Sequence, residues 1–110
     1  MTTTCNDARC FDEAFQYCEP GVVFTTEEAV GARVEYEILY SFVEEGVRGC
    51  EVSMVYRENP NPDWVDKPLR LTLDPQQPFM EEITQGLQQC VEGTPGRYAC
   101  EGPLVEAMQQ

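Results

Sequence analysis

Six cysteines without a single histidine constrain this chain of 110 residues more than any other feature of its sequence. The cysteines are spread from one end to the other, at Cys5, Cys10, Cys18, Cys50, Cys90 and Cys100. An even set with no Cys-x-x-Cys pair is typical of a disulfide framework and not of a zinc or redox site. Disulfides persist in oxidising compartments, so the sequence predicts an extracytoplasmic location, which is to say secreted, periplasmic or at the cell surface.

The positions of the cysteines favour two bridges. Cys90 and Cys100 flank a short stretch rich in glycine and proline and are the first expected pair. Cys50 lies on the inward face of a predicted strand and must meet a helix, so Cys10 or Cys18 is its expected partner. Because six cysteines allow many connectivities, the sequence alone does not select one.

The charge balance is strongly acidic, with 20 Asp and Glu against 7 Lys and Arg and a net charge of −13. Phosphate binding needs clustered Lys or Arg, so the sequence excludes nucleic acid as a partner and disfavours anionic membrane surfaces. Three explanations of the acidity stay open: solubility at a cell surface, adaptation to high salt, and a cationic partner. The partner that we expect is a protein or a component of the cell envelope.

No stretch of the sequence approaches the ~20 apolar residues of a membrane span. A signal peptide begins with a basic region followed by an apolar one. The start of this sequence, Met1–Thr4, is neither basic nor apolar. We expect one domain over residues 1–110, with residues 1–5 a tail that starts a mature exported segment or was added ahead of it. Cys5 is then either an ordinary disulfide half or the site of a lipid anchor.

The first half of the chain predicts a helix followed by a long hairpin. Apolar residues recur at helical spacing between 8 and 18, and Glu19-Pro20-Gly21 ends that helix. After an extended run at 22–26, every second residue of a strand at 32–43 is apolar: Val34, Tyr36, Ile38, Tyr40 and Phe42. Glu44-Glu45-Gly46 forms a turn, and the returning strand at 48–57 directs inward Cys50, Val52, Met54 and Tyr56.

The second half adds a strand and a helix. Asn59-Pro60-Asn61-Pro62 ends the hairpin, since proline cannot donate to a β-ladder. Leu69–Leu73 predicts a further strand, and an apolar stripe from Phe79 to Cys90 predicts a second helix, before a loop at 93–96 and a short apolar tail. Together these elements predict an α+β fold, in which an antiparallel sheet of about four strands carries two helices on one face and is stapled by disulfides.

The loop from Asn59 to Trp64 is the segment that we expect to recognise a partner. It is rigid, forms turns and carries the only tryptophan, a residue enriched in binding hot spots. Pro62, Asp63 and Trp64 are the predicted binding residues. The alternative is that Trp64 folds back onto the core, because large aromatic side chains are usually mostly buried.

The sequence predicts no catalytic residue, no metal and no cofactor. Adjacent carboxylates occur at Glu27-Glu28, Glu44-Glu45 and Glu81-Glu82, but acid–base catalysis of the glycosidase kind needs two carboxylates that face each other across a cleft. Asp63 and Asp66 are not surrounded by a calcium-binding loop. We therefore expect a protein that is not an enzyme.

Cys10-Phe11, Cys18-Glu19-Pro20 and the alternating strand before Cys50 resemble small exported proteins of bacteria and archaea, many of them lipoprotein-like. The similarity covers about half of the chain and its motifs are short. It implies an extracytoplasmic location and passes on no catalytic residue. No lipobox precedes Cys5 in this sequence.

Two functions follow as hypotheses. The first is a small exported, disulfide-stabilised domain with a non-enzymatic binding or structural role at the cell envelope. The second is a protease-inhibitor-like or peptide-binding module that uses the Asn59–Trp64 loop, since a helix wrapped by an antiparallel sheet is similar to cystatin-like inhibitors. The Gln-x-Val-x-Gly hairpin of those inhibitors is absent, and Glu44-Glu45-Gly46-Val47 stands in its place.

Overall fold

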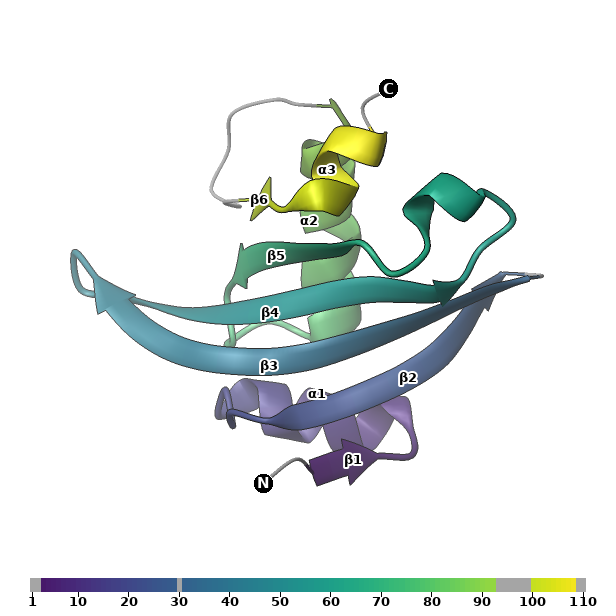
Figure 1. Cartoon of the computed structure of the whole chain (residues 1–110). Helices are drawn as coiled ribbons and strands as arrows, with labels where there is room; N and C mark the ends of the chain where they lie inside the picture. The colour runs from purple at the N-terminus through teal and green to yellow at the C-terminus, as the bar shows by residue number, and fades with distance from the viewer. Residues whose placement is uncertain (1–2, 30, 93–99, 109–110) are drawn as a thin grey trace.

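The computed structural model describes residues 3–29, 31–92 and 100–108, and its centre is one six-stranded sheet (Figure 1). The elements in chain order are β1 (Thr3–Cys5), α1 (Ala8–Gln16), β2 (Val22–Ala29), β3 (Ala32–Glu44), β4 (Val47–Glu58), the 3-10 helix η1 (Pro62–Trp64), β5 (Pro68–Leu73), α2 (Phe79–Glu92), β6 (Cys100–Glu101) and α3 (Pro103–Met108). The strands lie in the sheet in the same order as in the sequence. β1 and β2 are parallel, and each later strand is antiparallel to its neighbour.

The predicted α+β class is confirmed, whereas the predicted details of the sheet are wrong. The described sheet has six strands and is mixed, and three helices accompany it. β1 and β6 have three and two residues, too few for an alternating pattern to show in a sequence. The expected tail includes β1, since Thr3–Cys5 pairs with β2 and Cys5 is buried. The expected apolar tail contains α3, and the loop predicted at 93–96 lies outside the described residues.

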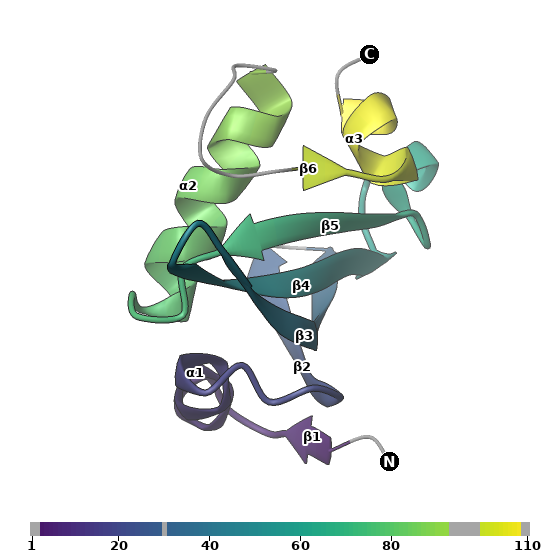
Figure 2. The ribbon, with the colours of Figure 1, turned by 90° about the vertical axis from the view of Figure 1, so that its left-hand side faces the viewer.

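α1 and α2 cover the same face of the sheet, and Figure 2 shows both on one side of it. Their aromatic residues meet at Phe79, whose ring centroid lies 4.8 Å from that of Phe11, 5.0 Å from Tyr36 and 5.2 Å from Phe15. Edge-on contacts of this kind stabilise a core beyond the burial of their area. The carboxylate of Asp12 on α1 accepts a hydrogen bond of 2.8 Å from the amide of Phe79. Since a helix start leaves amides unpaired, this bond fixes the start of α2 against α1.

The end of α1 is set by Cys18, which lies two residues beyond the helix. Its φ of 48° is in the left-handed region, where glycine is the usual residue. The amides of Cys18 and Glu19 donate to the carbonyls of Phe15 and Ala14, which is the hydrogen-bond pattern of a Schellman cap. A cysteine in this conformation costs about 1 kcal/mol or more relative to glycine, and its side chain is held there by a bridge to β4.

All six cysteines are paired, and both predicted bridges are confirmed. Cys90 pairs with Cys100, and Cys50 pairs with Cys18 and not with Cys10. Cys10 pairs instead with Cys5. A lipid on the sulfur of Cys5 and the Cys5–Cys10 bridge exclude each other chemically, because each uses the same atom. The lipid anchor at Cys5 stays a prediction.

A β-bulge in β3 corrects the prediction for Tyr40 and Phe42. Ile38 pairs with Val52 on β4, but the next pair is Tyr40 with Glu51, so Leu39 is an extra residue. One extra residue reverses the faces of every side chain that follows it. Tyr40, expected to point inward with Tyr36 and Tyr56, is therefore 48% exposed, and Phe42 shares its face.

We expect the Cys18–Cys50 bridge to contribute more to stability than the Cys90–Cys100 bridge. The two close loops of sequence separation 32 and 10, which the chain-entropy relation converts to about 4 and about 3 kcal/mol. Cys50 is also fully buried, so its loss disturbs core packing as well. Replacing both partners by serine should lower the Tm more for Cys18 and Cys50 than for Cys90 and Cys100. Equal melting temperatures would contradict this ranking.

We expect Tyr36→Phe to stabilise the protein by about 1 kcal/mol, because the Tyr36 hydroxyl is buried and has no hydrogen-bond partner in the described part of the chain. Tyr56→Phe should destabilise it by a similar amount, since the Tyr56 hydroxyl donates to Glu28. Denaturant unfolding of the two variants measures both effects. A loss of stability in Tyr36→Phe would show that its hydroxyl has a partner.

The same two tyrosines predict a loss of stability in alkali. Burial, with the charge of Glu28 as a smaller cause, raises the pKa of Tyr36 and of Tyr56 well above the usual value near 10. The folded state thus holds these protons more tightly than the unfolded state. The contribution of these two groups to stability is constant below about pH 10 and is lost as the pH rises above it. The fall between about pH 9 and about pH 11 should be smaller in Tyr36→Phe, and an unchanged fall would contradict this cause.

Candidate functional site

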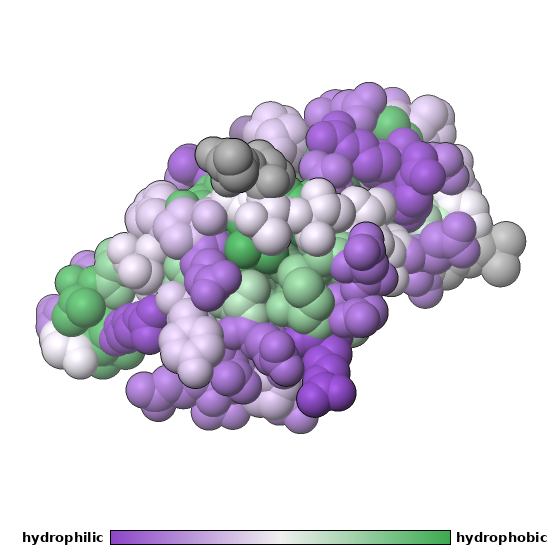
Figure 3. Space-filling view, turned by 90° about the horizontal axis from the view of Figure 1, so that it is seen from below, coloured by the Kyte–Doolittle hydropathy of each residue, from purple (hydrophilic) through white to green (hydrophobic). Residues whose placement is uncertain are grey.

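The exposed apolar side chains of this protein gather at one end of the molecule. Six large apolar residues of the described chain are exposed. Three of them, Tyr40, Val43 and Val47, lie on the arms of the β3–β4 hairpin, and a fourth, Tyr17, lies at the end of α1, where its carbonyl is bonded to Arg48 of β4. Val43 and Val47 are 71% and 69% exposed. Figure 3 shows the apolar surface of the hairpin tip at its left-hand end. We call these four residues together with Phe42 the hairpin end.

The hairpin end projects beyond the rest of the sheet. The last partner of β3 on β2 is Glu37, and the last partner of β4 on β5 is Cys50. The amide of Gly21 donates one further bond to the carbonyl of Ile38, and beyond it the two arms form strand pairs only with each other in the described chain, as the left side of Figure 1 shows. Glu45 and Gly46 form the turn with φ of 53° and 78°, the two positive values that a tight two-residue hairpin turn requires.

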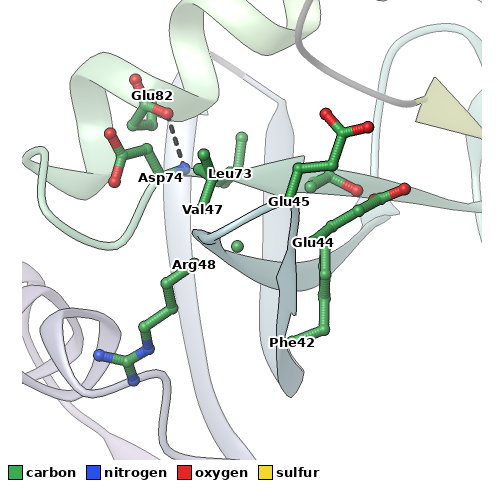
Figure 4. Close-up of a pocket in the computed structure, with 10 residues that line it drawn as sticks. Phe42, Glu44, Glu45, Val47, Arg48, Leu73, Asp74 and Glu82 are labelled. Atoms are coloured by element: carbon green, nitrogen blue, oxygen red, sulfur yellow. Dashed lines mark hydrogen bonds between the residues drawn. The ribbon is translucent and has the colours of Figure 1, made fainter.

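A hollow of about 300 Å³ lies between the hairpin end, the end of β5 and the start of α2. Phe42, Val47 and Leu73 form its apolar part. Carboxylates stand on two sides, with Glu44 and Glu45 on the hairpin and Asp74 and Glu82 across from them, as Figure 4 shows. The remaining lining residues are Arg48, Gly49 and Thr72.

The carboxylates of the hollow differ in how they are held. Glu82 is almost fully buried, and its Oε1 accepts the amide of Asp74 at 2.8 Å. The Asp74 carboxylate accepts the amide of Gln76 at 2.9 Å. Glu44 and Glu45 are exposed on the turn, and neither forms an ion pair in the described chain. The turn therefore carries two negative charges that no nearby cation neutralises.

Among the described residues that line the hollow, Arg48 is the one cation, and its side chain is directed away from the hollow. Its guanidinium donates a hydrogen bond of 2.8 Å to the carbonyl of Tyr17 at the end of α1. Figure 4 shows the side chain extending away from Glu44 and Glu45. A cation at a helix C-terminus is favoured by the exposed carbonyls there. Arg48 thus ties the hairpin to α1 and leaves the hollow acidic.

The predicted binding residues lie on another part of the molecule. Pro62 and Asp63 are exposed on η1, and the Asn61 side chain caps η1 by accepting the amide of Asp63. Trp64 is partly buried, and its ring stacks on Tyr56 with the centroids 6.1 Å apart. The tryptophan thus packs against the core, and of the three predicted binding residues only Pro62 and Asp63 are exposed.

A second hollow, of about 320 Å³, lies between α1, α2 and β2. Three of its residues, Phe11, Phe24 and Phe79, are almost fully buried core residues, and Met80 at its rim is 47% exposed. Its one carboxylate, Asp12, is already engaged by the start of α2. Arg9 of α1 also lines this hollow; its side chain is 90% exposed and forms an ion pair with Glu13 at 3.5 Å.

The described residues contain no group of three or more Cys, Asp or Glu side chains placed to hold a metal ion. In the same part of the chain, no helix is both long and apolar enough to cross a membrane. A comparison with protein-family models finds no match to this chain, and searches of curated proteins and of solved structures find none either. A proposal for the function of this chain therefore rests on the geometry of the molecule.

The sequence pattern missed the hairpin end because it placed Tyr40 and Phe42 in the core. The signal that could have revealed it is the length of β3. Thirteen residues exceed the usual strand by a factor of about two, so part of the strand had to extend beyond its neighbours. Val43 and Val47 flank a turn of charged residues, where apolar side chains have no core to join.

We expect Gly49→Ala to reshape the hollow without unfolding the protein. A β-carbon at Gly49 would lie 2.6 Å from the tip of the Phe42 ring, which is free to turn away at the edge of the molecule. The Tm should fall by less than about 5 °C, which corresponds to about 1 kcal/mol. Nuclear Overhauser contacts between the Phe42 ring and residue 49 should be lost.

Gly46→Ala is the matched control, since no atom lies within 4 Å of its added β-carbon but its φ is positive. It should destabilise the turn by about 1 kcal/mol and leave the Phe42 ring on Gly49. A Phe42 ring that stays in place in Gly49→Ala would contradict the described packing.

Proposed function

We propose that this chain is a small exported, disulfide-stabilised domain with a non-enzymatic binding role at the cell envelope, and that the hairpin end is its contact surface. The observation that carries this proposal is that three of the six exposed large apolar side chains of the described chain lie on the arms of one projecting hairpin, with a fourth, Tyr17, at the neighbouring end of α1. Exposed apolar side chains that gather at one end of a domain favour an interaction site, whereas apolar residues scattered singly over a surface are ordinary.

The rest of the fold supports a binding role for this end. The base of the hairpin is held by the Cys18–Cys50 bridge and by the bond from Arg48 to α1. A rigid support lowers the conformational entropy lost on binding, so a pre-organised hairpin binds more tightly than a flexible one. The three bridges and the acidic surface accord with an extracytoplasmic location.

The oxidised state of the cysteines tests the location. Protein isolated from its natural source under denaturing, thiol-blocking conditions should contain no free thiol. Cytosolic proteins are kept reduced by glutathione and thioredoxin, so a protein of the cytosol would yield free thiols at all six positions. That outcome would overturn the proposal that the domain works outside the cytosol.

A matched pair of surface variants tests the binding role. Val43→Ser with Val47→Ser removes two exposed apolar residues from the hairpin end, whereas Met80→Ser with Val91→Ser removes two exposed apolar residues elsewhere. A partner captured from the envelope fraction by crosslinking is identified and purified, and its affinity for each variant is then measured. The first variant should bind about tenfold more weakly, and the second should match the wild type.

A third variant, Pro62→Ala with Asp63→Ala, tests the alternative contact on the Asn59–Trp64 loop. A loss of affinity in this variant alone would replace the hairpin end by the loop, which would then be the peptide-binding surface. A wild-type protein that captures no envelope partner would refute the binding role itself.

A further inference from the structure

The hollow beside the hairpin end occupies the place where β5 stops. β5 pairs with β4 as far as Leu73 and Cys50, and the chain then turns away at Asp74 towards α2. The outer edge of β4 at Val47–Gly49 therefore has no strand beside it in the described chain. Unpaired backbone groups on a strand edge form a template for an added strand. A segment that continues the line of β5 would enter the hollow directly.

The lining of the hollow determines which side chain fits it. Its apolar lining comes from Phe42, Val47 and Leu73, of which Val47 is the most exposed, and the carboxylates in its lining are those of Glu44, Glu45, Asp74 and Glu82. Lysine and arginine side chains are complementary to this lining, because each has an apolar stem and a cationic head. A basic side chain can lay its stem on the apolar residues and direct its head to the exposed carboxylates of the turn.

The net charge selects the class of partner. The chain carries a charge of −13, and Arg48, the one cation that the described residues contribute to the lining, is bonded to the end of α1. A second copy of the chain would bring the same excess of negative charge to the hollow, and like charges in an interface are costly. A basic partner is drawn to this surface by the charge that repels another copy.

We infer that the hollow receives one lysine or arginine of an extended segment of a partner protein, and that this segment adds to the free edge of β4 at Val47–Gly49. The inference rests on the proposed binding role of the hairpin end and specifies the partner chemistry. The backbone edge provides alignment, and the acidic hollow provides selectivity for the basic residue.

The test uses synthetic pentapeptides, Thr-Val-Xaa-Val-Thr with blocked ends and a fluorescent label, in which Xaa is lysine, norleucine or glutamate. The lysine peptide should bind about tenfold more tightly than the norleucine peptide, and the glutamate peptide should bind most weakly. Raising the salt from about 50 to about 500 mM should weaken the lysine peptide and leave the norleucine peptide nearly unchanged. Amide shifts in the NMR spectrum should concentrate at Val47–Gly49.

Two double variants give the control. Glu44→Gln with Glu45→Gln removes the free charges of the turn, whereas Glu27→Gln with Glu106→Gln removes the same charge from exposed positions elsewhere. The first should weaken the lysine peptide about fivefold or more and leave the norleucine peptide unchanged. The second should bind both peptides as the wild type does.

Several outcomes would overturn the inference. Equal affinity for lysine and norleucine, no binding of any peptide, or shifts away from the β4 edge would each do so. A dimer in sedimentation experiments that Val47→Ser dissociates would replace the basic partner by a second copy. A failure here is distinct from a failure of the proposed function, because the capture experiment with Val43→Ser and Val47→Ser uses the natural partner and assumes nothing about its charge.

Discussion

The bridge between Cys18 and Cys50 fixes the place where the hairpin leaves the sheet. Along β4 towards the β3–β4 turn, Cys50 is the last residue that has a strand on both sides. It pairs with Ser41 on β3 and with Leu73 on β5. Its sulfur is bonded to Cys18, the residue that ends α1 in a left-handed conformation. The covalent bond therefore compensates for an unfavourable backbone angle at one end and supports the free part of the hairpin at the other. The part of the hairpin between Cys50 and the turn therefore projects from a position that the disulfide holds in place.

The bulge at Leu39 determines what that projecting part displays. Without the extra residue, Tyr40 and Phe42 would follow Tyr36 and Ile38 on the helix-covered face. With it, the aromatic residues turn to the opposite face, where Tyr40 pairs with Glu51 and Phe42 with Gly49 across the hairpin. The contact of the Phe42 ring with Gly49 depends on the missing side chain at that position. One inserted residue thus turns side chains that would join the core towards the surface of the molecule.

The elements with a strong repeating pattern could be predicted from the sequence, and the details that depend on distant contacts could not. The helix at Phe79 and the alternating run through Tyr36 follow from local periodicity, and the two predicted disulfides follow from the elements on which the cysteines lie. The bulge leaves no trace, because Leu39, between Ile38 and Tyr40, is as apolar as its neighbours. The bond from Asp12 to the Phe79 amide joins residues 67 positions apart, and no local pattern reveals such a bond.

The candidate site was less predictable than the fold. The sequence directed attention to Trp64 because it is the only tryptophan, but a large aromatic ring can equally well cover a core, and here it stacks on Tyr56. The hollow is built from β3, β4, β5 and α2, so its residues are scattered over about forty positions of the sequence. Carboxylates on an acidic chain look alike in a sequence. Their different roles, a buried bond for Glu82 and exposed charge for Glu44, follow only from the fold.

The two short bridges hold the outermost strands of the sheet. Cys5 lies on β1 and Cys100 on β6, the strands at the two margins, and each is joined to a helix, by Cys10 on α1 and by Cys90 on α2. Strands of three and two residues form few backbone hydrogen bonds, so these disulfides help to hold β1 beside β2 and β6 beside β5. A reducing environment would release both margins at once and uncover backbone groups that invite disordered self-association. We therefore expect reduction of these bridges to promote self-association as well as to lower stability.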